Sequence, residues 1–598
     1  MSDSVVRDGR WALRPRDGGG KGWSVGARGL PMLALGLLAA CHSDSGTAPP
    51  GAIDVGQQLT ASGTSNLTLQ GGTSGADYVL VAYNSSPNGD TFASATITGN
   101  GLATAPSASL TADRFSSSSA AVLQGGAPAQ SLVPDDRFHM RLQQRVRAEA
   151  PRHLAASRAW FSARQAAATP TQGRFRAAPS YSAIPSTVAV GDIVTLNVNA
   201  DSVCNDPVYH GFRVTAVGTK SVVLADTLNP SGGFTSADYQ RFAAQFDTLI
   251  WPLDTRNFGQ PSDIDGNGRI AILFTLAVNQ LTSPNSDSFV GGFFFARDLF
   301  SATDSPITGP ACPASNEGEM FYMLVPDPNG TINGNVRRTG FVDSLTTGVL
   351  AHEFQHLINA SRRIYVNTNA TDFEVVWLNE GLSHIAEELL YYQQSGKSPR
   401  SNLSDADIRV NSPSTYPLWK ADASANFSRF LEYLQDPAHN SPTAGNDSLP
   451  TRGSTWSFLR YSVDQVSTNE AATWTAYDNS VDTGLTTIRF ALQMDPSTLF
   501  RTWALANYLD DTGYTTDPVY SHKSWNFRNI YSNTYVSLGG YPLVVNPLVD
   551  NTPASTRVRG LSAAYYRLSV SAGQSAQLTF STSGAGGANL NFIAIRIR

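Results

Sequence analysis

The sequence predicts an α+β protein of several domains, with β-rich segments on both sides of a helical region. Short β-like runs separated by Ser, Thr and Gly fill residues 56–130 and return after residue 530, whereas residues 341–510 have helical periodicity. A chain of 598 residues is too long for one ordinary core, so we expect two to four domains. Only 15% of the residues are charged and the net charge is −6, which argues against a coiled coil, a charged disordered chain and a nucleic-acid-binding protein.

The N-terminus has the pattern of an export signal. Basic residues precede an apolar run from Leu30 to Ala40, which is much shorter than the roughly 20 residues that a bilayer span needs. The junction Leu38–Cys41 (LAAC) resembles a bacterial lipobox. We therefore expect residues 1–41 to be a lipoprotein signal peptide. The mature protein would be an exported monomer, anchored by lipid on Cys41 to a bacterial membrane and facing the periplasm or the cell surface. The alternative is an ordinary signal peptide that happens to end at a cysteine.

Composition divides much of the remaining chain. Residues 42–55 have the composition of a linker, residues 56–130 that of a small β-sandwich, and residues 546–598 that of a C-terminal β segment. Residues 131–184 hold a basic, arginine-rich helix and a linker rich in Pro, Ser and Ala. This helix is either a propeptide or membrane-surface helix, or a solvated connecting helix, and we favour the connecting helix.

The two cysteines beyond Cys41 are expected to form a disulfide. Cys204 and Cys312 make an even number in an oxidising compartment, and the sequence has no CxxC pair that would favour a thiolate zinc site. Both lie in residues 185–340, where strands alternate with turns. We expect this region to be the β-rich lobe of a domain that spans residues 185–545 and has its helical lobe at 341–530.

Glutamate and histidine gather in residues 352–388, which hold five of the ten Glu and three of the nine His. Here His352-Glu353-Phe354-Gln355-His356 forms an HExxH motif with helical periodicity around it. His352 and His356 lie one turn apart, so they can bind one metal ion. Glu353 lies beside that ion, where a base can take a proton from activated water.

A third metal ligand is expected from the next helix. Thr371 and Glu374 have the spacing of a capping box, which predicts a helix that starts near Asp372. Glu380, in the run NEGLS, would then point from this helix towards the HExxH helix. It would complete the three protein ligands of a catalytic zinc site.

These motifs resemble the gluzincin metallopeptidases and, among them, the hyicolysin-like peptidases (peptidase family M30). The resemblance rests on HEFQHLIN at 352–359, WLNEGLS at 377–383, FGQPSDIDGNG at 258–268 and residues 521–530, and it covers about residues 185–545. It implies a thermolysin-like catalytic domain. It also implies that His352, His356 and Glu380 are zinc ligands and that Glu353 is the catalytic base.

Two roles stay open. Thermolysin-like relatives have, after the position of Ser383, an Asp that orients the first zinc histidine, whereas this chain has His384 there. Either His384 or Glu387 could orient it. The group that stabilises the oxyanion could be Arg452, His439 or Tyr461.

Residues 263–268 (DIDGNG) resemble the first half of a calcium loop. Asp263, Asp265 and Asn267 fill its first three ligand positions, but Phe274 stands where an EF-hand has its bidentate Glu. A calcium-stabilised turn and a plain turn before a strand are both open.

Together these features predict an extracytoplasmic zinc metallopeptidase that hydrolyses peptide bonds, as an endopeptidase rather than an exopeptidase. One alternative is a surface-anchored, non-catalytic binding lipoprotein that keeps a zinc site. Another is a metallohydrolase that acts on non-peptide substrates. We favour catalysis, because the sequence supplies three zinc ligands and structural zinc sites usually have four.

Overall fold

The computed structural model describes residues 53–103, 133–134, 136–168, 184–286, 288–303, 310–410, 414–584 and 586–598. All of them belong to one compact unit, residues 50–598. The expected signal peptide with Cys41 lies outside the described residues. None of the described helices combines the length and the apolar composition that a membrane crossing needs.

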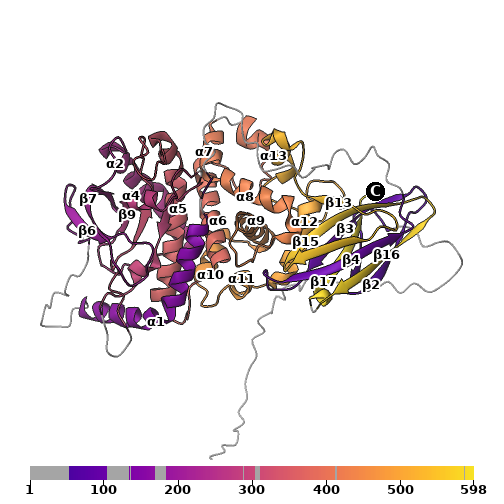
Figure 1. Cartoon of the computed structure of the whole chain (residues 1–598), viewed down its shortest axis with the longest axis horizontal. Helices are drawn as coiled ribbons and strands as arrows, with labels where there is room; N and C mark the ends of the chain where they lie inside the picture. The colour runs from indigo at the N-terminus through magenta and orange to yellow at the C-terminus, as the bar shows by residue number, and fades with distance from the viewer. Residues whose placement is uncertain are drawn as a thin grey trace, which may run out of the picture. The chain divides into compact units, whose positions relative to one another are not determined.

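Strands from both ends of the described chain form one β-sandwich, in which the indigo and yellow strands of Figure 1 interleave. Its five-stranded sheet has the order β1-β17-β3-β15-β13 and its four-stranded sheet the order β14-β4-β16-β2. The central strand β3 (Ala76–Asn84) pairs with β15 (Ser562–Val570) on one side and β17 (Leu590–Arg596) on the other. The other strands are β1 (Gln58–Ser62), β2 (Ser65–Gln70), β4 (Phe92–Asn100), β13 (Val545–Pro547), β14 (Ala554–Arg559) and β16 (Ser575–Ser583).

The expectation of separate β modules at residues 56–130 and 546–598 is therefore wrong. The N-terminal segment contributes only four strands to the sandwich, and β3 is buried along its whole length. Both hydrogen-bonding edges of such a strand need partners, and the C-terminal strands provide them. The two segments are halves of one domain.

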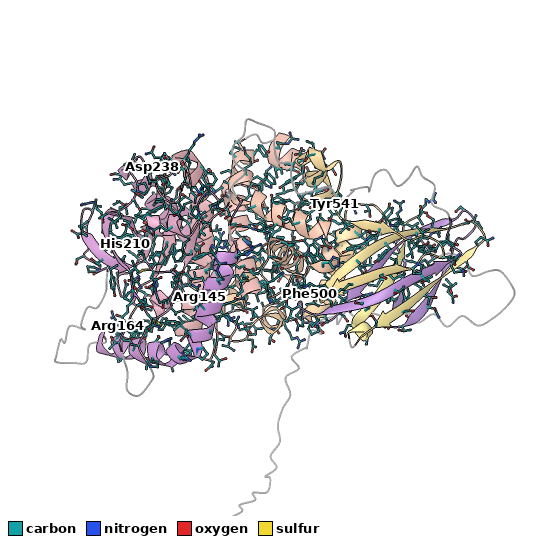
Figure 2. All side chains as sticks on the ribbon, viewed as in Figure 1. Arg145, Arg164, His210, Asp238, Phe500 and Tyr541 are labelled. Carbon is teal, nitrogen blue, oxygen red and sulfur yellow. A yellow bond between two sulfur atoms is a disulfide. The ribbon has the colours of Figure 1, made fainter. Side chains whose placement is uncertain are left out.

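The basic helix α1 (Asp136–Ala168) follows the two-residue strand β5 (Val133–Pro134). Every fourth residue on one of its faces is buried and apolar; these are Phe138, Leu142, Val146, Ala150 and Leu154. Arg158 donates hydrogen bonds to the carbonyl oxygens of Arg363, Ile364 and Ala370. Arg145 and Arg164, labelled in Figure 2, lie on the same helix. The helix is thus not a solvated connection, because one face packs into the core.

A six-stranded mixed sheet forms the β-rich lobe, in the order β11-β12-β9-β8-β7-β6. Its strands are β6 (Ile193–Asn197), β7 (Tyr209–Val217), β8 (Ser221–Asp226), β9 (Ile270–Phe274), β11 (Gly292–Phe294) and β12 (Met320–Met323). Helices α2 (Ser236–Gln245), α3 (Trp251–Phe258) and α4 (Leu276–Gln280) belong to this lobe, with π-helix Phe246–Ile250 and 3₁₀ helix Ala296–Leu299. Strand β10 (Ser288–Phe289) pairs with β5 instead. The predicted disulfide between Cys204 and Cys312 is present in this lobe.

The helical lobe begins with α5 (Thr339–Ser361) and α6 (Val376–Ser395), which pack side by side. It continues with α7 (Thr415–Asp422), α8 (Ser424–Gln435), α9 (Leu449–Val466), α10 (Glu470–Asp478), α11 (Leu485–Leu492), α12 (Pro496–Leu509) and α13 (Phe527–Asn533). Shorter turns are the π-helices Arg362–Val366 and Ala406–Val410 and the 3₁₀ helices Pro437–His439, Pro518–Tyr520, Val536–Leu538 and, in the sandwich, Gly587–Asn589. Phe500, labelled in Figure 2, stacks on Phe458 with ring centroids 3.6 Å apart and joins α12 to α9. The α+β class is confirmed.

Helix α6 starts at Val376, so the predicted start at Asp372 is wrong. The capping box does not form, because Glu374, its second member, has a stronger partner. Glu374 pairs with Arg363 at 2.6 Å, and Asp372 pairs with Arg147 of α1 at 2.8 Å. Charge-assisted pairs of this kind outweigh a neutral cap.

Candidate metal centre

The HExxH motif lies on the buried C-terminal half of α5. His352, Glu353 and His356 are each at most 6% exposed. The helix packs against β11 and β12 of the sheet and against α6, so the apolar side chains around the motif fix how α5 is rotated. This rotation decides that both histidines face α6.

Glu380 of α6 meets the two histidines, as the sequence predicts. Its Oε2 lies 3.5 Å from His352 Nε2 and its Oε1 lies 3.5 Å from His356 Nε2. Donor atoms that bind one zinc ion tetrahedrally at about 2.1 Å are about 3.4 Å apart, so these spacings fit zinc. His356 Nε2 is buried and has no hydrogen-bond partner among the described residues. A buried nitrogen of this kind is costly unless it binds an ion.

Hydrogen bonds at the other ring nitrogens orient both histidines. His352 Nδ1 lies 2.8 Å from Glu387 Oε1, and His356 Nδ1 lies 3.0 Å from Ser383 Oγ. Ser383 donates its own proton to Gln355, so its oxygen accepts from His356. Both Nδ1 atoms therefore carry the proton, and both Nε2 lone pairs point into the cluster, where a metal ligand needs them.

Glu387, and not His384, orients the first histidine of the motif. His384 Nδ1 lies 3.2 Å from Glu387 Oε2, and Asn426 donates to the same oxygen at 3.1 Å. His384 thus fixes the position of the Glu387 carboxylate, and this carboxylate in turn orients His352. Sequence spacing alone left these two residues open because they lie on the same face of α6.

The electrostatics of the cluster favour a cation. Burial lowers the pKa of His352, but the carboxylates of Glu380 and Glu387 outweigh burial and raise it to about 10. Burial also lowers the pKa of His356, to about 3, against the opposing effect of Glu380. The carboxylates thus attract one positive charge to this point, and a metal ion supplies it.

Glu353 lies beside the cluster and has a different partner. Its Oε2 accepts a hydrogen bond from the backbone N–H of Phe294 on β11, at 2.8 Å. Burial and the nearby Glu380 raise its pKa to about 7, against the opposing effects of His352, the Phe294 N–H and Arg452. A carboxylate with this pKa can exchange a proton near neutral pH.

Of the three candidates for oxyanion stabilisation, only Arg452 reaches the cluster. Its Nη1 lies 2.7 Å from Glu380 Oε2, and its Nη2 lies 2.6 Å from Asp447 Oδ2. Tyr461 donates to the carbonyl of Val519 instead. His439 pairs with Asp436 on the surface, where its side chain is 58% exposed.

A fourth histidine, which sequence reasoning missed, joins the cluster. His139 of α1 belongs with His352, His356 and Glu380 to a group whose ligand atoms all lie within 4.8 Å of one another. No motif spacing connects His139 to the others, because it lies on a helix from another part of the chain. The only hint in the sequence is a histidine within the basic helix.

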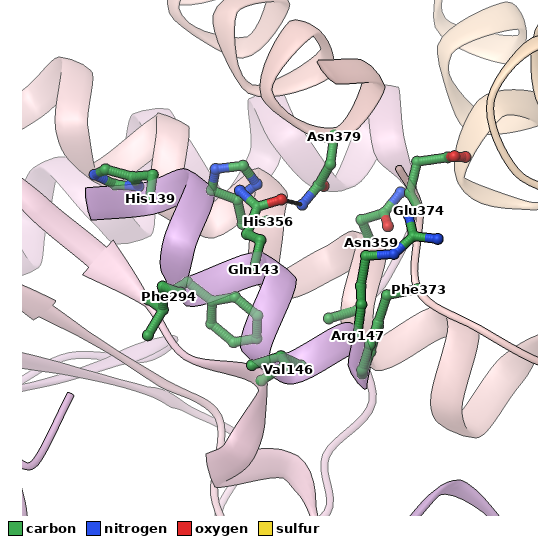
Figure 3. A pocket seen from close by; sticks show the side chains of 13 residues that line it. His139, Gln143, Val146, Arg147, Phe294, His356, Asn359, Phe373, Glu374 and Asn379 are labelled. Carbon is green, nitrogen blue, oxygen red and sulfur yellow. Dashed lines mark hydrogen bonds between the residues drawn. The ribbon is translucent and has the colours of Figure 1, made fainter. Parts of the chain in front are cut away.

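Two hollows flank the cluster, and His139 lines both. The hollow in Figure 3 is lined by Gln143, Val146 and Arg147 of α1 and by Phe294, His356 and Asn379 of the facing elements. Gln143 accepts a hydrogen bond from Asn379 at 2.9 Å, drawn dashed there. The other hollow is lined by Gly292, His352, Glu353, Glu387, Arg429 and Arg452, among others.

Comparison with known proteins gives one distant similarity. No protein-family model matches the sequence. The chain is 27% identical to the neutral metalloprotease ShpI of Staphylococcus hyicus over 232 residues, which are 36% of this chain and 48% of that protease. The chain thus spans about half the length of the relative that it matches. This similarity and the buried His/Glu cluster together support a metallopeptidase that binds a metal ion, most simply zinc.

Proposed function

We propose that the protein is a zinc-dependent peptidase in which His352, His356 and Glu380 hold the metal and Glu353 is the general base. The observation that carries this proposal is the spacing of 3.5 Å between the Glu380 oxygens and both histidine Nε2 atoms. Glu353 supports it, because this carboxylate lies next to the ligands in the chain and bonds to Phe294 instead.

A bound zinc ion would supply Lewis-acid chemistry by polarising a carbonyl and making water more acidic. Glu353 accepts the proton from the attacking water, and the Phe294 N–H holds its other oxygen in place. Glu387 and Ser383 keep the two histidines in the tautomer that binds metal. Arg452 places positive charge beside Glu380, at one wall of the hollow that contains Glu353.

Peptide bonds are the proposed substrate class, with endopeptidase activity favoured. Strand β11, which carries Phe294, is one of the two edge strands of the sheet. An extended peptide can pair with such an edge through its backbone, whatever its side chains are. The metalloprotease similarity also supports this substrate class.

Export and lipid attachment are part of the proposal; export rests on the basic residues and the apolar run before Cys41, and lipid attachment rests on the LAAC junction. Radiolabelled fatty acid should enter the wild-type protein and not a Cys41→Ser variant. Equal release of both forms into the medium would contradict the lipid anchor.

Two substitutions test the catalytic roles in opposite ways. Glu353→Gln preserves all ligands, so zinc should stay near one equivalent while casein cleavage falls by about 10²-fold or more. Glu380→Ala removes a ligand, so zinc and activity should both be lost. Each is measured in the intact chain and in a His139→Ala background, because His139 lies on the cluster. A zinc-loaded protein that cleaves nothing in either background would contradict the peptidase.

One observation favours a second candidate, a binding protein with a structural zinc site. His139 brings the number of clustered donor residues to four, and structural zinc sites usually have four protein ligands. In that case His139→Ala would weaken zinc binding and create no activity.

A further inference from the structure

The N-terminal half of α1 lies over the candidate metal centre. His139 is within the ligand cluster, and Gln143, one turn later, donates a hydrogen bond to Glu380 Oε1. Arg147, one further turn along, pairs with Asp372 at 2.8 Å. Residues at intervals of four share one helical face, so a single face of α1 makes all three contacts.

The residues just before α1 also occupy part of the cleft edge. Val133 and Pro134 pair in parallel with Ser288 and Phe289 of β10, three residues before β11 begins. Strand β10 therefore already pairs with an extended segment of the chain.

A catalytic zinc ion needs one coordination position for water or substrate. His352, His356 and Glu380 leave that position open, and His139 brings a fourth donor atom within 4.8 Å of theirs. We propose that His139 is the fourth zinc ligand of a latent form and that the face of α1 that carries His139, Gln143 and Arg147 is an inhibitor within the chain. This proposal rests on the proposed peptidase function. The enzyme becomes active when this face of α1 leaves the cleft.

The cobalt-substituted protein tests the ligand without relying on activity. A hydroxamate should change the visible spectrum of a His139→Ala variant at concentrations that leave the wild type unchanged, because only the variant has an open coordination position. Arg152→Ala is the matched control, since Arg152 lies on the exposed side of the same helix and pairs, among the described residues, with Glu149 of its own helix. Equal responses of the wild type and His139→Ala would overturn the proposal.

Zinc X-ray absorption of the intact wild type gives an answer even if the variant does not fold. Three imidazole ligands are expected, and two would overturn the proposal. Casein cleavage by His139→Ala should rise by about tenfold or more if the open form is a minor population of the wild type. If the cobalt spectrum shows an open site and casein is still not cleaved, His139 is a ligand but the peptidase function fails. The two failures are therefore distinguishable.

A second inference concerns the loop at residues 263–268 and is independent of the first. This loop precedes β9, and Glu319 precedes β12, the parallel neighbour of β9. The starts of β9 and β12 consequently bring three carboxylates together, those of Asp263, Asp265 and Glu319. Their ligand oxygens lie within 4.8 Å of one another. Asn267 is used elsewhere, because its side chain bonds to Ile184, Asp265 and Arg269.

Glu319 is the carboxylate that the loop itself lacks. Its side chain is 2% exposed, and Oε1 accepts a hydrogen bond from the Ile264 N–H at 2.7 Å. Oε2 is buried and has no hydrogen-bond partner in the part of the chain that the structure describes. Hard carboxylate oxygens favour calcium. We propose that Asp263, Asp265 and Glu319 bind a calcium ion that joins the loop before β9 to β12.

Thermal unfolding of the zinc-loaded protein during a calcium titration tests this site. The midpoint of the wild type should rise with calcium, because a ligand that binds the folded state stabilises it. Glu319→Gln should abolish the rise. Asp263→Asn should weaken it, and this exposed position should tolerate substitution if Glu319→Gln does not fold. Asp201→Asn, in which the aspartate is 90% exposed, is the control and should respond like the wild type. The proposed site would be wrong if calcium did not change the unfolding midpoint of the wild type, or if the midpoint still rose in both Glu319→Gln and Asp263→Asn.

Discussion

Glu387 Oε1 lies 2.8 Å from His352 Nδ1, so the helix that supplies the third proposed metal ligand also orients the first. Glu380 and Glu387 are two turns apart on α6 and share one face of it. His384 and Asn426 hold the second oxygen of Glu387 in turn. The position of His352 Nε2 therefore depends on a chain of contacts that runs from α8 through α6 to α5.

Glu387→Gln should weaken zinc binding by about 10- to 100-fold, the usual cost of losing a group that orients a metal ligand. The amide can still accept from His352, but it lacks the charge that makes the imidazole a better donor to metal. Competition with a chromogenic chelator measures the dissociation constant. Asp436→Asn, at an exposed pair with His439, is the control and should bind zinc like the wild type. Equal constants for Glu387→Gln and the wild type would show that Glu387 does not support His352.

Loss of the disulfide should destabilise the β-rich lobe. Cys204 and Cys312 are 108 residues apart, and a cross-link that closes so long a loop stabilises by up to about 5 kcal/mol in the chain-entropy model. Denaturant unfolding of the Cys204→Ser/Cys312→Ser double variant should show a loss of this order. Mass spectrometry of a non-reduced digest should find the linked peptides in the wild type. Two free thiols in exported protein would contradict the pairing.

Gly453→Ala should destabilise the helical lobe and weaken metal binding. A Cβ at this position would lie 2.2 Å from the backbone of Arg429 and Phe430, so α8 and α9 would have to separate. Overpacking of this kind costs about 1–3 kcal/mol, and here it also displaces Arg452. Gly340→Ala is the matched control, because no described atom lies within 4 Å of its Cβ. This helical change should stabilise by about 0.4–1 kcal/mol. Equal unfolding midpoints for the two variants would contradict the close approach of α8 and α9.

Asp254→Asn should become more stabilising as pH rises. Burial and the neighbouring Asp478 hold the pKa of Asp254 well above the unfolded value of 3.8. Neither of its carboxylate oxygens has a hydrogen-bond partner among the described residues. The stability that this protonated group contributes is fully present below about pH 4 and is lost as pH rises through the folded pKa. Asparagine does not titrate, so the unfolding midpoint of the variant relative to the wild type should increase between pH 5 and pH 8.

The Asp238→Asn variant should show the opposite dependence of stability on pH. Hydrogen bonds from the backbone and side chain of Thr235, in the capping box of α2, lower the pKa of Asp238. Its stabilising contribution is present above the unfolded pKa and is lost as pH falls through the folded pKa. This variant should therefore be less stable than the wild type at neutral pH and should approach it in acid. The same pH trend in both variants would contradict the burial of Asp254.

Local spacing was enough to predict much of the candidate site. His352 and His356 share a helical face because four residues make about one turn, and Glu380 follows on the next helix, which packs on α5. The disulfide follows from counting two cysteines in an oxidising compartment. The predicted capping box at residues 371–374 does not form. Glu374 and Asp372 instead form ion pairs with Arg363 and Arg147, which are more stable than the local hydrogen bonds of a cap.

The sequence by itself determined the HExxH pair, the proposed third ligand on the following helix and the α+β class, because each depends on residues close together in the chain. The tertiary structure decided what distant segments do. It brought His139 to the cluster, Glu319 to the loop at residues 263–268, and β15 and β17 to the two edges of β3. These contacts arise when separate elements bury their apolar faces against one another. Such packing carries no fixed sequence spacing, so no motif records it.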